Sequence, residues 1–339
     1  MNKIFAFAIV AAFSVIYFAS ISFALEREPL RSEELSLKLQ KTSKEKVKLA
    51  ILVELADEYR LEENFDKAFL TCNEALNLDP DRKKKQKIFR IIGDIYFAKK
   101  DFSHAINYYQ DAVALAPEHE GVRLSLAKAY EESDLYELAI QEYLKILKMN
   151  QKSFEANFSL GNLYLREGFP DKALRYYRRA LSIRIDARVY RNLAVCYESS
   201  GEINLAISVI KSAAAINTVY EDYIDLGRLY SAKKKYKEAE ESFVKALDLN
   251  KNIIDGYVYL GLLYIENNDI EAAKNTFISA CEGFPDNALA HFFLGNIYFK
   301  EKLVSFAKKE IEKSSKLAKD DILKKYSQRY LEFINKTIR

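Results

Sequence analysis

The feature that most constrains this chain is an internal repeat with a period of 33–37 residues. Each copy contains Leu or Ile, then Gly or Ala, and then Tyr three residues later. Because an α-helix turns once every ~3.6 residues, these positions share one face of a helix. The small residues of the eight copies are Ala56, Gly93, Ala127, Gly161, Ala194, Gly227, Gly261 and Gly295.

A second helix is predicted in every copy, because an alanine always stands twelve residues after the small residue. Such a helical hairpin cannot bury its apolar face alone, whereas stacked hairpins bury it against their neighbours. The chain has only 10 Gly and 5 Pro in 339 residues, too few for the frequent turns of a β-sandwich or β-barrel, so we expect an all-α fold. The alanines are Ala68, Ala105, Ala139, Ala173, Ala206, Ala239, Ala273 and Ala307.

The linked positions of the two helices resemble those of the tetratricopeptide repeat (TPR) family. The resemblance implies a right-handed α-solenoid of stacked helix-turn-helix repeats over residues 49–321. Residues 25–48 precede the repeats as a lead-in segment, with a short helix expected near Ser32. Residues 322–339 are expected to form a C-terminal capping helix, with Asp321 as its N-cap. The eight repeats begin near residues 49, 86, 120, 154, 187, 220, 254 and 288.

Two local departures from the family pattern carry predictions. Repeat position 4, where the family often has Trp, is polar in the third and fourth repeats, at Arg123 and Asn157. We therefore expect looser packing at this corner of those two repeats. The basic run from Arg82 to Lys87 fills the longest spacing between repeats, so it forms either a loop insertion or an extended start of a first helix.

Residues 1–24 have the pattern of a secretory signal peptide. Lys3 supplies a positive charge, the following stretch to Ala24 is uncharged, and small residues at Ser22 and Ala24 favour cleavage after Ala24. The uncharged stretch is also long enough to span a bilayer, so a signal anchor formed by residues 4–24 is the alternative. Both interpretations predict an exported, periplasmic or extracytoplasmic chain, either soluble after cleavage or associated with the membrane through this segment.

The sequence contains no pattern typical of an enzyme, a cofactor site or a metal site. It has no Gly-rich phosphate loop and no nucleophile elbow, and its histidines are not closely spaced with one another or with a cysteine. The 52 basic and 49 acidic residues nearly balance, which argues against nucleic acid as the main partner. The histidines are His104, His119 and His291, and the cysteines, expected to be buried and free, are Cys72, Cys196 and Cys281.

In the TPR family, repeat positions 2, 5, 9, 12 and 13 line a concave groove, so the resemblance implies which side chains meet a partner. The first repeats place charged residues there, whereas the last two place apolar ones. A contiguous apolar patch usually marks an interaction surface, so we expect this end to take an apolar segment of a protein partner. The alternative is that the C-terminal helix or a second copy of the chain covers it. The apolar candidates are Val258, Leu262, Ile265, Leu289, Phe292 and Phe299.

A polar candidate site consists of Asn162, Arg188, Arg191 and Asn192, on adjacent first helices. Basic and amide side chains can hold a carboxylate, and some family members clamp the C-terminal carboxylate of a partner in this way. The family's clamp is incomplete here, because Phe158 stands where the family has Lys. The alternative is that the two arginines pair with nearby Glu residues.

Together these features predict an exported, non-catalytic scaffold that binds a protein or peptide partner through its groove, without a cofactor. One alternative is a self-associating structural or assembly protein of the cell envelope, which would form homo-oligomers. Another is an accessory subunit that recruits substrate for an envelope enzyme.

Overall fold

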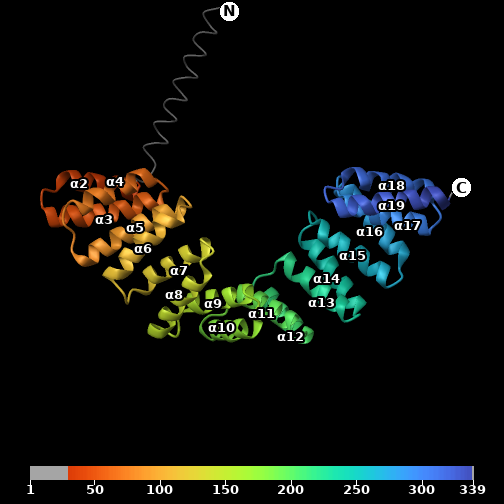
Figure 1. Cartoon of the computed structure of the whole chain (residues 1–339), viewed down its shortest axis with the longest axis horizontal. Coiled ribbons are helices and arrows are strands. Elements are labelled where there is room, and N and C mark those ends of the chain that lie inside the picture. The colour runs from red at the N-terminus through yellow and green to blue at the C-terminus, as the bar shows by residue number, and fades with distance from the viewer. Residues whose placement is uncertain (1–29, 338–339) are drawn as a thin grey trace, which may run out of the picture. The chain divides into compact units, whose positions relative to one another are not determined.

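The computed structural model describes residues 30–337, and all regular secondary structure in this part of the chain is helical (Figure 1). The predicted all-α solenoid of stacked hairpins is confirmed. The chain divides after Gln151 into two compact units, which are described separately. The signal peptide or anchor predicted for residues 1–24 lies outside the described residues. Among residues 30–337, no helix combines the length and the apolar character that a membrane crossing requires.

Unit 1 contains a lead-in helix, α2, followed by three hairpins formed by α3 with α4, α5 with α6, and α7 with α8. The first helix of each later hairpin packs on the second helix of the hairpin before it. The helices are α2 (Arg31–Lys41), α3 (Glu45–Leu61), α4 (Phe65–Leu76), α5 (Arg82–Ala98), α6 (Phe102–Leu115), α7 (Glu120–Glu132) and α8 (Tyr136–Met149).

Unit 2 contains five hairpins and one final helix, α19, with the same order of packing. Its helices are α9 (Phe154–Arg166), α10 (Pro170–Ile183), α11 (Ala187–Ser199), α12 (Ile203–Ile216), α13 (Tyr220–Ala232), α14 (Tyr236–Leu249), α15 (Ile254–Glu266), α16 (Ile270–Gly283), α17 (Ala288–Lys300), α18 (Val304–Leu317) and α19 (Asp321–Thr337).

The turn inside every described hairpin contains one residue with a positive φ angle, at the same place in the repeat. This conformation ends the first helix and reverses the chain, and it is most readily adopted by glycine. Only Gly168 and Gly201 use glycine for it; the other turns use Glu63, Lys100, Asp134, Lys234, Asn268 and Lys302.

The core of most hairpins is a contact between the small residue of the first helix and a large side chain of the second. At Gly227, an added Cβ atom would lie 2.4 Å from Cε1 of Phe243, whose ring is 1 % exposed. Gly93 and Gly161 face Tyr109 and Tyr177 in the same way. The missing Cβ therefore lets the two helices approach closely enough to bury a ring between them.

The polar residues at repeat position 4 are bonded. Arg123 Nε donates to the carbonyl oxygen of Pro117 (2.6 Å), and its Nη1 donates to Glu142 Oε2 (2.5 Å). Asn157 is fully buried and donates from Nδ2 to the carbonyl oxygen of Ser153 (2.7 Å). The sequence suggested looser packing here because an apolar side chain is missing. In the structure, hydrogen bonds replace the missing apolar contact.

The longest spacing between repeats is occupied by an extended first helix. Helix α5 begins at Arg82, so the basic run belongs to its first turns, and Asp81 caps it by accepting from Lys84 N (2.9 Å). Arg82 Nε donates to the carbonyl oxygen of Leu115, at the end of α6 (2.6 Å). Of the two sequence-based interpretations, the extended helix is the one observed.

The C-terminal helix packs on the last hairpin, with Ile334 fully buried. Its N-cap is Asp320 and not Asp321, because Asp320 Oδ1 accepts from Ile322 N (3.0 Å) and Oδ2 from Leu323 N (3.3 Å). The expected cap was therefore wrong by one residue, and Asp321 is the first residue of α19.

Candidate binding surface

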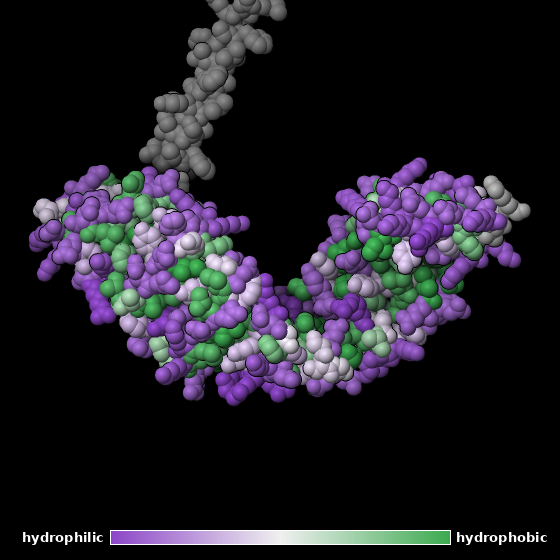
Figure 2. Space-filling view, viewed as in Figure 1, coloured by the Kyte–Doolittle hydropathy of each residue, from purple (hydrophilic) through white to green (hydrophobic). Residues whose placement is uncertain are grey.

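The candidate binding surface lies on the first helices of the hairpins, as the repeat register implies. We call it the first-helix face, formed by α3, α5 and α7 in unit 1 and by α9, α11, α13, α15 and α17 in unit 2, each unit considered by itself. Hydrophilic side chains dominate the visible surface of both units, with smaller apolar areas between them (Figure 2).

Five charged side chains of α3 and α5 form a half-buried cluster on the first-helix face of unit 1. Within α3, Arg60 Nη2 donates to Asp57 Oδ1 (2.6 Å), and within α5, Arg90 Nη1 donates to Asp94 Oδ2 (3.2 Å). Between the helices, Asp57 Oδ2 lies 3.6 Å from Lys87 Nζ and 3.7 Å from Arg90 Nη2. The three cations exceed the two carboxylates by one positive charge, so the cluster favours an acidic group of a bound segment.

Asp94 is the most buried member of this cluster, with a side chain 16 % exposed. Burial raises the pKa of Asp94 above its ordinary value, although the hydrogen bond from Tyr109 Oη (2.7 Å) and the nearby Arg90 and Arg60 oppose the rise. The folded chain therefore holds a proton on this carboxyl more tightly than the unfolded chain does.

The pH dependence of stability should report this raised pKa. The contribution of Asp94 to stability is greatest below the unfolded-state pKa, about 4, and is lost as the pH rises through the folded-state pKa. The free energy of unfolding of Asp94→Asn, relative to the wild type, should therefore increase with pH over this window, as measured by urea unfolding. Tyr109→Phe removes a contact that lowers this pKa and should move the window to higher pH. A flat difference for Asp94→Asn would contradict the assignment.

The arginines of the polar candidate site are paired with aspartates, not with the glutamates that the alternative named. Arg191 Nε and Nη2 donate to the two carboxylate oxygens of Asp222 (2.6 and 2.9 Å), which is fully buried. Arg188 donates from Nε and Nη2 to Asp186 (3.0 and 2.7 Å) and is 60 % exposed. Both pairings use side chains of unit 2 itself, so they stabilise the fold without any ligand.

The two asparagines of this site are bonded to each other. Asn192 Nδ2 donates to Asn162 Oδ1 (2.8 Å), which also accepts from Tyr177 Oη (2.8 Å). The structure therefore brings Asn162 and Asn192 together on α9 and α11, and Arg188 lies over the ring of Phe158 at 5.1 Å.

The apolar candidates are less exposed than the groove register predicts. Val258 is only 8 % exposed, so it is a core residue of unit 2 and does not belong to an open surface. The other five, Leu262, Ile265, Leu289, Phe292 and Phe299, are half-buried.

Helix α19 covers two of these apolar candidates. The ring of Phe299 packs edge-on against Tyr330 (centroids 5.7 Å apart) and Phe333 (5.6 Å), and Phe292 lies 6.1 Å from Tyr330. The alternative in which the C-terminal helix covers this end therefore applies to Phe292 and Phe299. Leu262, Ile265 and Leu289 remain the partly accessible apolar candidates.

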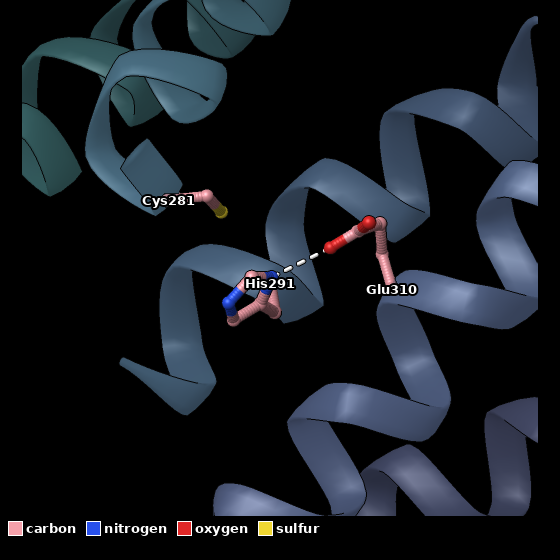
Figure 3. A group of neighbouring side chains, drawn as sticks. All are labelled: Cys281, His291 and Glu310. Atoms are coloured by element: carbon pink, nitrogen blue, oxygen red, sulfur yellow. Dashed lines mark hydrogen bonds and ion pairs between the residues drawn. The ribbon is translucent and has the colours of Figure 1, made fainter. Parts of the chain in front are cut away.

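A group of polar side chains that the sequence did not indicate lies in the last two hairpins. The ligand-type atoms of Cys281, His291 and Glu310 are all within 4.8 Å of one another. They come from α16, α17 and α18, and His291 Nδ1 lies 2.6 Å from Glu310 Oε2 (Figure 3). Burial raises the pKa of the Cys281 thiol to about 12, and the Glu310 carboxylate adds to the rise.

The other histidines and cysteines have structural surroundings. His119 caps α7 by accepting from Val122 N (3.3 Å), and His104 bonds Asp101 (2.8 Å). Cys72 and Cys196 are buried, Cys281 is partly buried, and all three are free thiols.

The fold defines a class of protein, an α-solenoid of stacked helical hairpins. Four models of the tetratricopeptide repeat match the chain, at residues 49–82, 96–160, 154–186 with 220–253, and 260–305, which together exceed half its length. The chain belongs to the tetratricopeptide repeat family.

Individual known proteins are similar to parts of the chain. The chain is 31 % identical over 159 residues to the ycf37 protein of Cyanophora paradoxa, with 45 % of this chain and 90 % of that protein covered. It is 24 % identical over 177 residues to BBS4, a BBSome complex member from Bos taurus, with 52 % and 33 % covered. The match thus spans only about a third of the length of BBS4.

A solved structure shows the same fold. The C-terminal part of a TPR repeat-containing protein from Cytophaga hutchinsonii aligns with a TM-score of 0.61 at 20 % identity, covering 69 % of this chain and 97 % of the other.

Proposed function

We propose that this chain is an exported, non-catalytic scaffold that holds a protein partner on its first-helix face. The observation that carries the proposal is the half-buried charged cluster of α3 and α5, in which Arg60, Lys87 and Arg90 outnumber Asp57 and Asp94. Side chains that are accessible yet already oriented by their neighbours bind a partner at a low entropic cost. The relative BBS4 is named as a member of the BBSome complex, which is consistent with a role of this chain in a protein assembly.

The first-helix face of unit 2 supplies a second kind of contact. Val195, on α11, is 47 % exposed, and the half-buried Leu262 and Ile265 lie on α15. Accessible aliphatic groups beside charged ones suit an amphipathic peptide or helix of a partner. The export part of the proposal depends on residues 1–24, whose uncharged stretch follows Lys3.

Site-specific photo-crosslinking in the cell that makes the chain tests the proposal. A photoreactive residue replaces Val195 on the first helix α11 or, as a matched control, Val244 on the second helix α14, which has the same residue type and is 41 % exposed. We expect position 195 to form a crosslinked product that is heavier than the chain alone, and position 244 to form little of it. The mass of the N-terminal peptide in the same sample shows whether the chain is cut after Ala24.

Three outcomes of this experiment separate the alternatives. Equal adducts from both positions would contradict a role for the first-helix face. An adduct that consists of two copies of this chain would support the self-associating alternative instead. A chain recovered in the cytoplasm with Met1 to Ala24 intact would contradict export while leaving the binding face untouched.

A further inference from the structure

The group formed by Cys281, His291 and Glu310 joins three helices of the last two hairpins. Cys281 lies in the last turn of α16, His291 on α17 and Glu310 on α18 (Figure 3). His291 is 2 % exposed and the Glu310 side chain is 15 % exposed. The three side chains lie close together in a largely buried part of the fold. A charged group buried there requires a partner.

The third hairpin has a group of bonded side chains at the same repeat positions. There, Arg123 bonds the carbonyl oxygen of Pro117 and the carboxylate of Glu142. In the last hairpin, His291 bonds the carbonyl oxygen of Pro285 and the carboxylate of Glu310, with identical spacings along the chain. The remaining position of the corner is Val113 in the earlier repeat and Cys281 in the later one. Where the third hairpin has an arginine and a valine, the last hairpin thus has a histidine and a cysteine, two residue types that are common zinc ligands.

The hydrogen bonds of His291 determine which ring nitrogen could hold a metal. Nε2 lies 2.9 Å from the carbonyl oxygen of Pro285, which is only an acceptor, so Nε2 carries the proton of this bond. Nδ1 then faces Glu310 Oε2 at 2.6 Å, and the Cys281 thiol lies within 4.8 Å of the ligand-type atoms of both residues. A second-shell carbonyl that fixes one nitrogen and leaves the other for the metal is the usual arrangement around metal-bound histidine.

We propose that Cys281 Sγ, His291 Nδ1 and Glu310 Oε2 bind one zinc ion, with a water molecule as the fourth ligand. Zinc takes thiolate, imidazole and carboxylate ligands at about 2.0–2.3 Å in a tetrahedral arrangement. This geometry places ligand atoms roughly 3.3–3.6 Å apart, so small side-chain rotations suffice from the observed positions. Binding displaces the thiol proton and the proton between Nδ1 and Glu310, and Zn²⁺ with one thiolate and one carboxylate is electrically neutral. The ion would tie the seventh hairpin to the eighth.

Metal titration of the purified full chain tests this proposal, with the metal-free protein prepared by chelation. We expect one zinc ion per chain by calorimetry, a rise in the thermal unfolding midpoint, and a thiolate-to-cobalt charge-transfer band when Co²⁺ replaces Zn²⁺. Cys281→Val should abolish the band and weaken zinc binding by more than about 100-fold.

His291→Arg is the matched control for folding, because it recreates the Arg123 and Glu142 pair of the third hairpin. We expect this variant to fold with an unfolding midpoint close to that of the metal-free wild type and to bind no zinc. The cysteines Cys72 and Cys196 remain in both variants, so zinc binding that persists at full strength in either variant would overturn the proposal. A wild type that shows neither the cobalt band nor a zinc-dependent midpoint would also overturn it.

Discussion

Replacing Arg191 with methionine is expected to lower the free energy of unfolding by about 3 kcal/mol. The substitution keeps most of the aliphatic stem but removes the only cation that bonds Asp222 within the described residues, and this carboxylate is fully buried. Removing one partner of a buried ion pair leaves an uncompensated charge, and this is more costly than the loss of the attraction alone. Urea unfolding followed by circular dichroism measures the change.

Two comparisons isolate the buried charge as the cause. Arg188→Met removes an arginine that is 60 % exposed and leaves Asp186 with Arg184 at 3.7 Å, so it should cost less than about 1 kcal/mol. The double variant Arg191→Met with Asp222→Ala removes both charges, so it should be more stable than Arg191→Met alone. Equal losses in Arg188→Met and Arg191→Met would refute this account.

The loss of stability in Arg191→Met should be concentrated in two hairpins. Arg191 lies on α11 and Asp222 on α13, the first helices of neighbouring hairpins. Since stability in repeat arrays depends on interfaces between neighbours, amide hydrogen exchange should accelerate most in these two hairpins.

A second large effect is expected at the close approach of α13 and α14. Gly227→Ala places a Cβ atom 2.4 Å from the Phe243 ring, and relief of this overlap should cost about 2 kcal/mol in spite of the better helix propensity of alanine. Urea unfolding measures it, with Gly283→Ala as the control, because an added Cβ there meets no described atom within 4 Å.

The fifth hairpin supplies the compensating change. It pairs Ala194 with Ile210 at the same two positions, both of them buried. Adding Phe243→Ile to Gly227→Ala should therefore recover part of the lost stability, with a coupling of about 1 kcal/mol. If the stability changes of the two substitutions were simply additive, the contact between Gly227 and the Phe243 ring would not determine the spacing of the two helices.

The fold could be predicted from the sequence because every hairpin repeats the same linked positions. The small residue at Gly161 and the ring at Tyr177 belong to one hairpin, so their contact follows from periodicity. The predicted N-cap of α19 was wrong by one residue because Asp320 and Asp321 are adjacent aspartates of equal capping ability. Only the backbone geometry shows which of them caps the helix.

The candidate surface could be predicted less completely, because a register states where a side chain points but not what covers it. Phe292 and Phe299 occupy groove positions, yet α19 lies over them, and α19 is outside the repeats. The group of Cys281, His291 and Glu310 was missed because its members are 10 and 19 residues apart on three helices. A comparison of repeat position 4 and the residues that contact it, from one repeat to the next, could have revealed this group.

Helix α19 has a consequence for assembly. It packs on α18 and contacts α17, just as α7 packs on α6 and contacts α5 in unit 1. The final helix therefore occupies the surface on which the first helix of a ninth repeat would stack. A second copy that approaches this end therefore meets the outer face of α19, on which Ile322, Tyr326 and Phe333 are exposed, and not the apolar face of the eighth hairpin.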